Sequence, residues 1–497
     1  MSSKYILAID QSTSGTKALL FDQEGELIAR SDLPHNQIVS EKGWVEHNPD
    51  QIYKNTIEVV KKVILQAGIN RDNIIGVGIS NQRETAMAWD KNTGLPVHNA
   101  IVWQCARGEA ICKQIEQAGY QMMIKSHTGL HLSPYFSASK ISWILQNVTE
   151  AKIKADRQEL CAGTMDSWLV YKLTKGQSFK TDYSNASRTQ LFNINTLSWD
   201  QEICELFDIP TTMLAEVCNS NAFYGETDFE GFLDHPVPIR SVLGDSHGAL
   251  FGQGCIERGM IKTTYGTGSS IMMNIGDEPV FSRKGIVTSL AWGIDGHIDY
   301  VLEGNINYSG AVIKWLIDDV KLISSAKESS ELPKTANKED RTYLVPAFSG
   351  LGAPYWDSSA TASLSGMTRT TGKAEIVKAA VECIAYQITD IVKLMAEESQ
   401  VAIRELRVDG GPTKNEYLMQ FQSDMLDIPV KVPELEELSA IGAAYLAGIT
   451  LGLYKKDKLF LKMNRKSYDP IMDRERREKQ YRGWKAAVSG VLTNTDS

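Results

Sequence analysis

A short hairpin pattern that occurs twice constrains this chain more than any other feature of its sequence. Residues 7–20 (LAIDQSTSGTKALL) and 263–274 (TTYGTGSSIMMN) each predict a strand, a tight Gly/Ser/Thr turn and a second strand. Such turns use glycine for positive φ. They also direct backbone N–H groups and hydroxyls toward one point, which suits a phosphate. Two such turns predict two related lobes that bind one polyphosphate between them, whereas two ordinary hairpins are the alternative interpretation.

Composition narrows the function classes. A chain of 497 residues is too long for one core, and its net charge of −9 includes no basic cluster that would indicate nucleic acid. We expect no membrane insertion, because no apolar run is long enough to span a bilayer, and no signal peptide. The seven cysteines are scattered without a CxxC pair, so neither a zinc site nor a disulfide framework is predicted. Free thiols are typical of the cytoplasm, where we expect this protein.

Hydrophobic periodicity predicts the same order of elements in both halves. In the first half we expect strands over 4–21 (a hairpin), 27–30 and 73–79, and helices over 50–67, 140–145 and 167–173. In the second half we expect strands over 261–265, 270–275, 287–290 and 406–409, helices over 372–397, 415–426 and 439–453, a charged surface helix over 473–484 and a polar tail, 493–497. This order is typical of mixed sheets covered by helices, and the boundary is expected within 251–259. We therefore divide the chain into residues 1–253, with the substrate site and phosphate hairpin, and residues 254–497, with the nucleotide loops.

Three loops of the second half could bind a nucleotide. Gly266 and Thr267 lie in the second hairpin turn, Gly310 lies at an expected helix start, and Gly411 and Asn415 follow a strand end. Helix N-termini and backbone nests bind anions without a lysine. The last loop is equally explained as a plain strand-to-helix turn. No Walker A pattern occurs, which disfavours a P-loop NTPase.

Two adjacent charged residues directly follow a predicted buried strand. Arg83 and Glu84 occupy the kind of loop in which open α/β sheets bind ligands. One donates and the other accepts, so together they could bind neighbouring hydroxyls. A surface ion pair is the alternative. Trp103 and Tyr135 could supply apolar walls to this pocket or simply belong to the core.

Two aspartates carry the expected chemistry. Asp245 lies in LGDSHG, at a predicted strand end where a helix could begin, and could accept a proton from a substrate hydroxyl that attacks phosphorus. Asp10, inside the first turn, is better placed to organise Mg²⁺, which bridges phosphate oxygens. The alternatives are structural, because Asp245 could be a helix N-cap and Asp10 could close a turn.

Several longer strings resemble those of the FGGY carbohydrate kinases, and within that family most closely those of the glycerol kinases. The resemblance covers nearly the whole chain. It rests on residues 44–47 (WVEH), 80–84 (SNQRE), 100–105 (AIVWQC), 181–188 (TDYSNASR), 264–268 (TYGTG), 350–357 (GLGAPYWD), 407–411 (RVDGG) and 419–424 (MQFQSD). Both family signatures are also present, over residues 135–147 (YFSASKISWILQN) and from residue 362 to residue 382.

This resemblance implies an α/β fold of two ribonuclease-H-like (actin-like ATPase) domains, with mixed β-sheets flanked by helices and an ATP cleft between them. It implies transfer of the γ-phosphoryl group of ATP to a terminal hydroxyl of a small polyol or ketose, with Mg²⁺, in a homodimer or homotetramer. Asp245 would be the base and Asp10 the metal ligand. The resemblance assigns ATP to Thr13, Ser14, Lys17, Gly266, Thr267, Gly310, Gly411 and Asn415, and the acceptor to Arg83, Glu84, Trp103, Tyr135 and Asp245.

The chain departs from the glycerol kinase pattern in the expected acceptor pocket. Ser246 and His247 replace two glutamines, and Ser270 replaces an aromatic residue. A lost hydrogen bond to substrate costs about 1–3 kcal/mol, roughly a ten- to hundredfold loss of affinity. The main prediction is therefore a kinase of a longer polyol or a ketose, with Ser246, His247 or Ser270 binding an added hydroxyl. The alternative is an ordinary glycerol kinase that makes glycerol 3-phosphate. A non-catalytic actin-like sensor is disfavoured by the retained aspartates.

Overall fold

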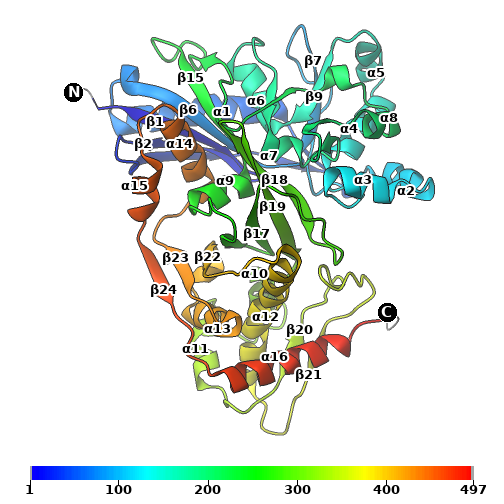
Figure 1. Ribbon diagram of the computed structural model, residues 1–497, viewed down its shortest axis with the longest axis vertical. Helices are drawn as coiled ribbons and strands as arrows, with labels where there is room; N and C mark the ends of the chain where they lie inside the picture. Colours follow the sequence, from blue (N-terminus) through cyan, green and yellow to red (C-terminus); the bar gives the residue numbers. More distant parts are fainter. Residues whose placement is uncertain (1–2, 494–497) are drawn as a thin grey trace.

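The computed structural model describes residues 3–493, which form two α/β domains (Figure 1). The N-terminal domain contains a six-stranded sheet in the order β14-β15-β6-β1-β2-β3. Strand β1 pairs antiparallel with β2 and parallel with β6, so the predicted hairpin and the predicted buried strand are both confirmed, and they lie side by side. The strands are β1 (Tyr5–Gln11), β2 (Gly15–Phe21), β3 (Leu27–Pro34), β6 (Ile74–Asn81), β14 (Glu226–Thr227) and β15 (Val237–Gly244).

The C-terminal domain repeats this arrangement around a seven-stranded sheet in the order β18-β19-β17-β16-β22-β23-β24. Here β16 pairs antiparallel with β17 and parallel with β22, as β1 does with β2 and β6. The duplicated plan expected from the two hairpins is therefore confirmed, whereas the sequence did not predict strands β19, β23 and β24. The strands are β16 (Ile261–Tyr265), β17 (Ser269–Gly276), β18 (Val287–Ile294), β19 (His297–Ile306), β22 (Leu406–Asp409), β23 (Val430–Pro433) and β24 (Arg465–Tyr468).

A second N-terminal sheet, in the order β4-β5-β8-β7-β9, was not predicted. Its strands are short, which weakens any periodic signal. They are β4 (Gln37–Val39), β5 (Val45–His47), β7 (Ala86–Asp90), β8 (Ala100–Ile101) and β9 (Leu160–Thr164). Three two-stranded ribbons complete the strands: β10 (Lys180–Asp182) with β13 (Glu216–Cys218), β11 (Phe192–Asn193) with β12 (Ser198–Trp199), and β20 (Tyr343–Val345) with β21 (Ser363–Ser365).

Helices cover the sheets of both domains. The N-terminal helices are α1 (Pro49–Ala67), α2 (Glu109–Gln117), α3 (Gln121–Thr128), α4 (Ser137–Asn147), α5 (Thr149–Asp156), α6 (Met165–Leu173), α7 (Tyr183–Ala186), α8 (Gln201–Leu206) and α9 (Asp245–Gly252). The C-terminal helices are α10 (Gly310–Asp318), α11 (Glu328–Thr335), α12 (Lys373–Ser399), α13 (Glu416–Leu426), α14 (Leu438–Thr450), α15 (Lys456–Leu461) and α16 (Arg474–Ser489). Three short 3₁₀ turns occupy 71–73, 211–213 and 411–414. None of the helices within residues 3–493 is both long and apolar enough to cross a membrane.

One helix packs against the domain that lies far from it in sequence. Helix α14 contacts β1, β6 and β15 and lies beside the N-terminal sheet in Figure 1. The approach is close because Gly78 of β6 lacks a side chain, and a Cβ atom there would lie 2.3 Å from the Ala443 carbonyl oxygen. The N-terminal sheet is therefore completed by a helix from the second half of the chain.

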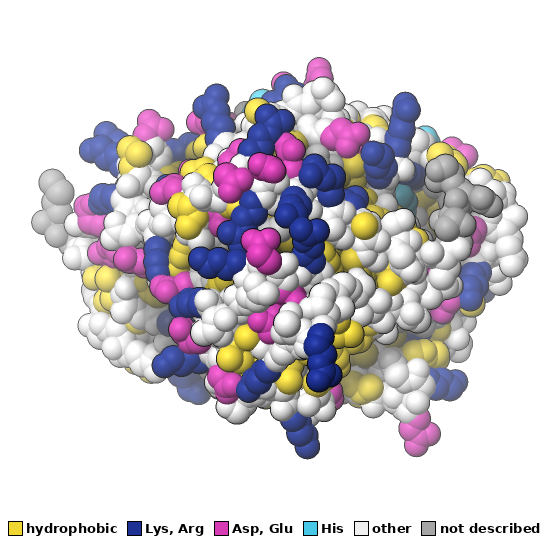
Figure 2. Space-filling view, turned by 90° about the horizontal axis from the view of Figure 1, so that it is seen from below, with side chains coloured by type: hydrophobic (Ala, Val, Ile, Leu, Met, Phe, Trp, Pro, Cys, Tyr) yellow, Lys and Arg dark blue, Asp and Glu magenta, His cyan; other side chains and the backbone are white. Residues whose placement is uncertain are grey.

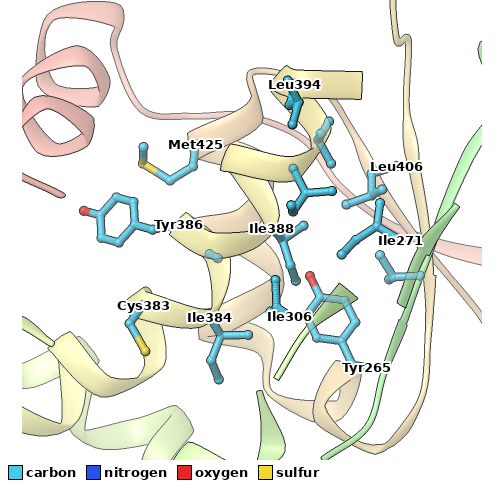
Figure 3. Packing of buried hydrophobic residues seen from close by; sticks show 14 of the residues in the cluster. Tyr265, Ile271, Ile306, Cys383, Ile384, Tyr386, Ile388, Leu394, Leu406 and Met425 are labelled. Carbon is cyan, nitrogen blue, oxygen red and sulfur yellow. The ribbon is translucent and has the colours of Figure 1, made fainter. Parts of the chain in front are cut away.

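The largest core lies between helix α12 and the C-terminal sheet. Ile388 lies on the side of α12 that faces Ile271 and Leu406 of the strands (Figure 3). Burial of each such side chain stabilises the fold by about 1.5–3 kcal/mol. This contact holds the strands that lead into the loops predicted to bind the nucleotide.

The expected surface helix at the C-terminus is longer than predicted and is anchored to the core. Trp484 of α16 is buried, lies parallel to the Tyr386 ring at 5.3 Å and donates a 2.8 Å hydrogen bond to Asp390. On the face seen in Figure 2, Lys and Arg side chains alternate with Asp and Glu. The predicted tail lies outside the described residues except for Thr493, whose backbone N–H donates to Asp357.

Candidate active site

The first hairpin presents a buried carboxylate to the cleft between the domains. Asp10 is only 4% exposed, and its Oδ2 lies 3.9 Å from Nζ of Lys17 across the hairpin. Its Oδ1 accepts no hydrogen bond from the described residues. Burial raises the pKa of Asp10 to about 6. A buried carboxylate with an unused oxygen favours a nearby cation, which would hold it in the charged form.

Lys17 is already paired with a residue that sequence reasoning missed. Glu437, at the N-terminal end of α14, forms ion pairs with Lys17 and with Arg30, the latter at 2.8 Å. The backbone of Glu437 has φ +64°. The remaining two predicted hairpin residues lie in the turn itself: Ser14 is exposed, and Thr13 accepts a 3.0 Å hydrogen bond from the Trp103 indole.

Asp245 lies where β15 ends and α9 begins, as the sequence predicted. Its Oδ1 accepts a 2.6 Å hydrogen bond from the Ser246 backbone N–H and lies 3.1 Å from Nε of Arg83. Its side chain is 33% exposed. Asp10 and Asp245 both line a cleft of about 930 Å³. A half-exposed carboxylate that faces a cleft can reach a bound hydroxyl.

The structure brings the four predicted acceptor residues together beside Asp245. Arg83 and Glu84 are buried at the end of β6, and Glu84 has a left-handed φ of +59°. The rings of Trp103 and Tyr135 lie 5.5 Å apart and are inclined at 59°. Burial raises the pKa of the Tyr135 hydroxyl, and the Glu84 carboxylate raises it further, which indicates that the two groups lie near each other.

A chain of buried charges runs behind these residues and includes two that sequence reasoning did not assign. Arg188 donates a 2.6 Å hydrogen bond from Nε to Glu84, and its Nη1 lies 3.2 Å from Glu303. Glu303 accepts from both terminal nitrogens of Arg83, at 2.8 and 3.0 Å. Burial alone would raise the pKa of Glu303, but Arg188 and Arg83 outweigh burial and hold this pKa well below its usual range. Arg188 stands in a string that carried the family resemblance, whereas nothing local indicated Glu303.

The three predicted nucleotide loops contact one another. The backbone N–H of Gly310 donates a 2.9 Å hydrogen bond to the Gly266 carbonyl, and that of Ala311 donates to Thr267. Gly410 packs against the backbone of Tyr265, the residue before the turn. A second cavity of about 600 Å³ is lined by Gly310, Ser329, Asn415 and neighbouring residues. Both cavities share the lining residues Gly411, Lys414 and Glu416, so they lie side by side.

The three residues that depart from the glycerol kinase pattern occupy different environments. Ser246 lines the interdomain cleft. Ser270 has a buried hydroxyl oxygen without a partner among the described residues. His247 is completely buried, with Nε2 3.4 Å from the Ser289 hydroxyl, and both its Nδ1 and the Arg83 stem lie beside Gly244. Ser246 is thus open to a ligand, while His247 lies behind Arg83.

A buried lysine holds the segment that carries Tyr135. Lys140 of α4 donates from Nζ to the carbonyl oxygens of Pro134, Tyr135 and Phe136, at 2.5, 2.5 and 3.0 Å. The side chain is 0% exposed. Three acceptors on consecutive residues fix the local backbone and therefore the direction of the Tyr135 ring.

Replacing Lys140 by Met is expected to leave these carbonyls without a donor and to loosen the Tyr135 segment. We expect the free energy of unfolding to fall by about 2–4 kcal/mol and the KM for the acceptor to rise, because buried unpaired groups are costly. Denaturant unfolding and acceptor kinetics measure both effects. Lys378→Met is the control, since Lys378 is also buried and bonds a carbonyl, that of Asp340, away from the site. An unchanged acceptor KM in Lys140→Met would show that Lys140 does not position Tyr135.

Comparison with known proteins gives matches over nearly the whole chain. Two family models match: the N-terminal domain of the FGGY family of carbohydrate kinases over residues 5–252, and its C-terminal domain over residues 261–451. The glycerol kinase of Alkaliphilus oremlandii is 46% identical over 491 residues, which is 98% of this chain and 97% of that protein. Glycerol kinase 1 of Thermotoga maritima is 48% identical over 491 residues, 98% of this chain and 100% of that protein.

Solved structures agree with these matches. The glycerol kinase of Plasmodium falciparum with ADP superposes with a TM-score of 0.94 at 35% identity, and 99% of each chain is covered. A xylulose kinase from Lactobacillus acidophilus superposes with a TM-score of 0.88 at 21% identity, again over 99% of each chain, which shows a shared fold.

Proposed function

The chain belongs to the FGGY family of carbohydrate kinases, and on that premise we propose that it transfers the γ-phosphoryl group of ATP to a terminal hydroxyl of glycerol. The product is glycerol 3-phosphate. The observation that carries this proposal is the position of Asp245, which lines the interdomain cleft and lies 3.1 Å from Arg83 of the acceptor cluster. The relatives named glycerol kinase, at 46–48% identity over full length, support the choice of acceptor.

In this proposal Asp245 is the general base. Its carboxylate takes the proton of the acceptor hydroxyl as that oxygen forms a bond to the γ-phosphorus. The bond from the γ-phosphorus to the β–γ bridging oxygen breaks, and ADP leaves. Arg83 donates to one acceptor hydroxyl and Glu84 accepts from a neighbouring one, while Trp103 and Tyr135 pack against the carbon chain. The exposure of Asp245 and the burial of the other charges support these roles.

ATP is held, in the same proposal, by loops of both domains. The 600 Å³ cavity at Gly310 and Asn415 takes the nucleoside, and Gly411 lies at its junction with the cleft that takes the phosphates. The exposed turn at Gly266 and Thr267 covers the phosphates from the C-terminal side. Thr13, Ser14 and Lys17 approach from the N-terminal hairpin. Lys17 can bind a phosphate in this way only when its ion pair with Glu437 is broken.

The carboxylates present fit a magnesium ion. Asp10 has a buried oxygen without a partner, and Asp245 lines the same cleft. No group of three or more His, Cys, Asp or Glu side chains in the described part of the chain could hold a metal ion. The single carboxylate of Asp10 suffices for Mg²⁺, which keeps several waters and binds substrate phosphates, and Asp245 is then free to act as the base. When bound with ATP, the ion would neutralise charge on the phosphate oxygens.

Product analysis tests this proposal. Incubation with ATP, Mg²⁺ and glycerol, followed by ³¹P NMR, is expected to give ADP and glycerol 3-phosphate in equal amounts. ADP formation without a phosphorylated acceptor would contradict the proposal. Absence of ATP consumption with every acceptor tried would instead favour a non-catalytic sensor.

A kinase of a longer polyol or a ketose is a second candidate, favoured by Ser246 and Ser270. Ser246 lines the cleft, and the unpartnered hydroxyl of Ser270 could bind an added hydroxyl. Both serines are smaller than the residues of the glycerol kinase pattern, so they leave room for a longer acceptor. The burial of His247 behind Arg83 favours an indirect effect of that residue.

The double variant Ser246→Gln with Ser270→Phe should shift acceptor preference toward glycerol. The larger side chains refill the pocket, and a change of this size in a pocket alters discrimination by roughly ten- to a hundredfold. The ratio of kcat/KM for glycerol to kcat/KM for a four-carbon polyol measures the shift. An unchanged ratio would mean that the two serines do not set the length of the acceptor.

Three further expectations remain proposals. We place the domain boundary between residues 253 and 254. All seven cysteines are free thiols, which supports a cytoplasmic location. A homodimer or homotetramer is expected from the family resemblance, and analytical ultracentrifugation measures this oligomeric state.

A further inference from the structure

Glu303 lies at the point where the C-terminal domain reaches the proposed acceptor site. It belongs to β19, whereas Arg83, Glu84, Arg188 and Asp245 all precede residue 253. We infer that Glu303 is a positioning residue that holds Arg83 and Arg188 in the geometry needed for acceptor binding. This inference rests on the proposed function.

The contact between Glu303 and Arg83 fixes the orientation of the Arg83 side chain. Both terminal nitrogens of the guanidinium bind the two oxygens of Glu303, in a fork at 2.8 and 3.0 Å. Only Nε then faces Asp245, at 3.1 Å, and the same Nε lies 4.0 Å from Glu84. Bidentate pairs of this kind fix the plane of the guanidinium as well as its distance. Glu303 therefore determines which edge of Arg83 faces the acceptor.

The same carboxylate also orients Glu84 indirectly. Arg188 lies 3.2 Å from Glu303 through Nη1 and donates to Glu84 through Nε. Arg188 and Glu84 are 1% and 2% exposed, and Glu303 is completely buried. Glu303 thus contacts both arginines, and each arginine contacts a residue that faces the acceptor.

The charges of the surrounding side chains show which alternative ion pair the Glu303 carboxylate prevents. Glu84, Arg188, Glu303 and Arg83 sum to zero, so the half-exposed Asp245 carries the excess negative charge. Without Glu303, the terminal nitrogens of Arg83 would be free to pair with Asp245. That pair would replace the present single contact through Nε by a contact through the terminal nitrogens, and it would turn Arg83 away from the acceptor. The other titratable groups near Arg83 and Glu303 are His247 and Lys262. Both are buried, and neither can supply the negative charge of a carboxylate.

Glu303→Gln tests the inference because the amide has the same shape but directs a donor at the Arg83 donors. We expect the KM for glycerol to rise at least about tenfold and kcat to fall, with the KM for ATP within about twofold of the parent value. In an Arg83→Ala background the same substitution should add little, because Glu303 acts through Arg83. A merely structural role would lower stability without this separation of acceptor and ATP effects.

The matched control is Glu382→Gln. Glu382 is an equally buried carboxylate on α12 that accepts a hydrogen bond from Tyr417, outside the proposed site. Its acceptor and ATP parameters should stay within about twofold of the parent. Equal rises in the acceptor KM of both variants, or an unchanged value in Glu303→Gln, would overturn the inference.

A crystal structure of Glu303→Gln gives a readout that does not depend on turnover. The inference predicts that the Arg83 guanidinium rotates so that its terminal nitrogens, and not only Nε, face Asp245, and an unmoved guanidinium would refute it. If the parent enzyme phosphorylates no acceptor, the proposed function fails, while the orientation of Arg83 still decides the inference. The same crystals establish that the variant folds.

Discussion

Replacing Asp245 by Asn is expected to lower kcat by about 10³-fold, which is the usual size of a general-base contribution. Asn has the same shape and can still accept the hydrogen bond from the Ser246 backbone N–H. It cannot take a proton from the acceptor hydroxyl. ATP and acceptor binding should therefore change little compared with turnover. Steady-state kinetics together with isothermal titration of ADP separate the two effects.

Asp424→Asn serves as the control for this substitution. Asp424 is buried in the C-terminal domain, where it accepts hydrogen bonds from the backbone N–H groups of Ile471 and Met472. An amide oxygen can replace those acceptors, so turnover should persist. Parental turnover in Asp245→Asn would remove Asp245 from the role of base.

Replacing Gly410 by Ala should damage the nucleotide site severely. Gly410 has φ +97° and ψ 167°, a conformation that is nearly restricted to glycine. A Cβ atom there would lie 1.9 Å from the carbonyl oxygen of Tyr265. Because the Tyr265 atoms that it would meet belong to the backbone, the two predicted nucleotide loops must move apart. We expect a loss of about 2–5 kcal/mol in the free energy of unfolding and at least a tenfold rise in the KM for ATP.

Gly452→Ala separates backbone strain from displacement of the loops. Gly452 also has a left-handed φ, +71°, but a Cβ atom there meets nothing within 4 Å. This control should lose roughly 1 kcal/mol of stability and keep the parental KM for ATP. If Gly410→Ala matched the control in both measurements, the contact between the two loops would not matter for nucleotide binding.

The elements that the sequence predicted well are those defined by local patterns. The two hairpins, the helix of residues 50–67 and the strand before Gly410 all follow from periodicity and turn residues within a short window. Asp245 was expected at a strand end before a helix, and the structure has it there. The same local logic brought Arg83, Glu84, Trp103 and Tyr135 into one proposed pocket.

The features that were missed depend on contacts between distant segments. Helix α14 was predicted as a helix, but no local signal indicates that it packs on the N-terminal sheet. Glu437 and Glu303 are ordinary charged residues in sequence, and each gains its place only when the domains meet. Strand β19, which carries Glu303, was missed as well. Contacts of this kind depend on how distant segments fold together, and no local pattern in a single sequence indicates them.

The acceptor itself is the central claim, and relative kcat/KM values test it most directly. A coupled assay of ADP release should compare glycerol with dihydroxyacetone, erythritol, the pentitols, and the common tetruloses and pentuloses. The proposed function predicts that glycerol has the highest kcat/KM. A large advantage for a four- or five-carbon acceptor would contradict it and would identify Ser246 and Ser270 as marks of a changed specificity.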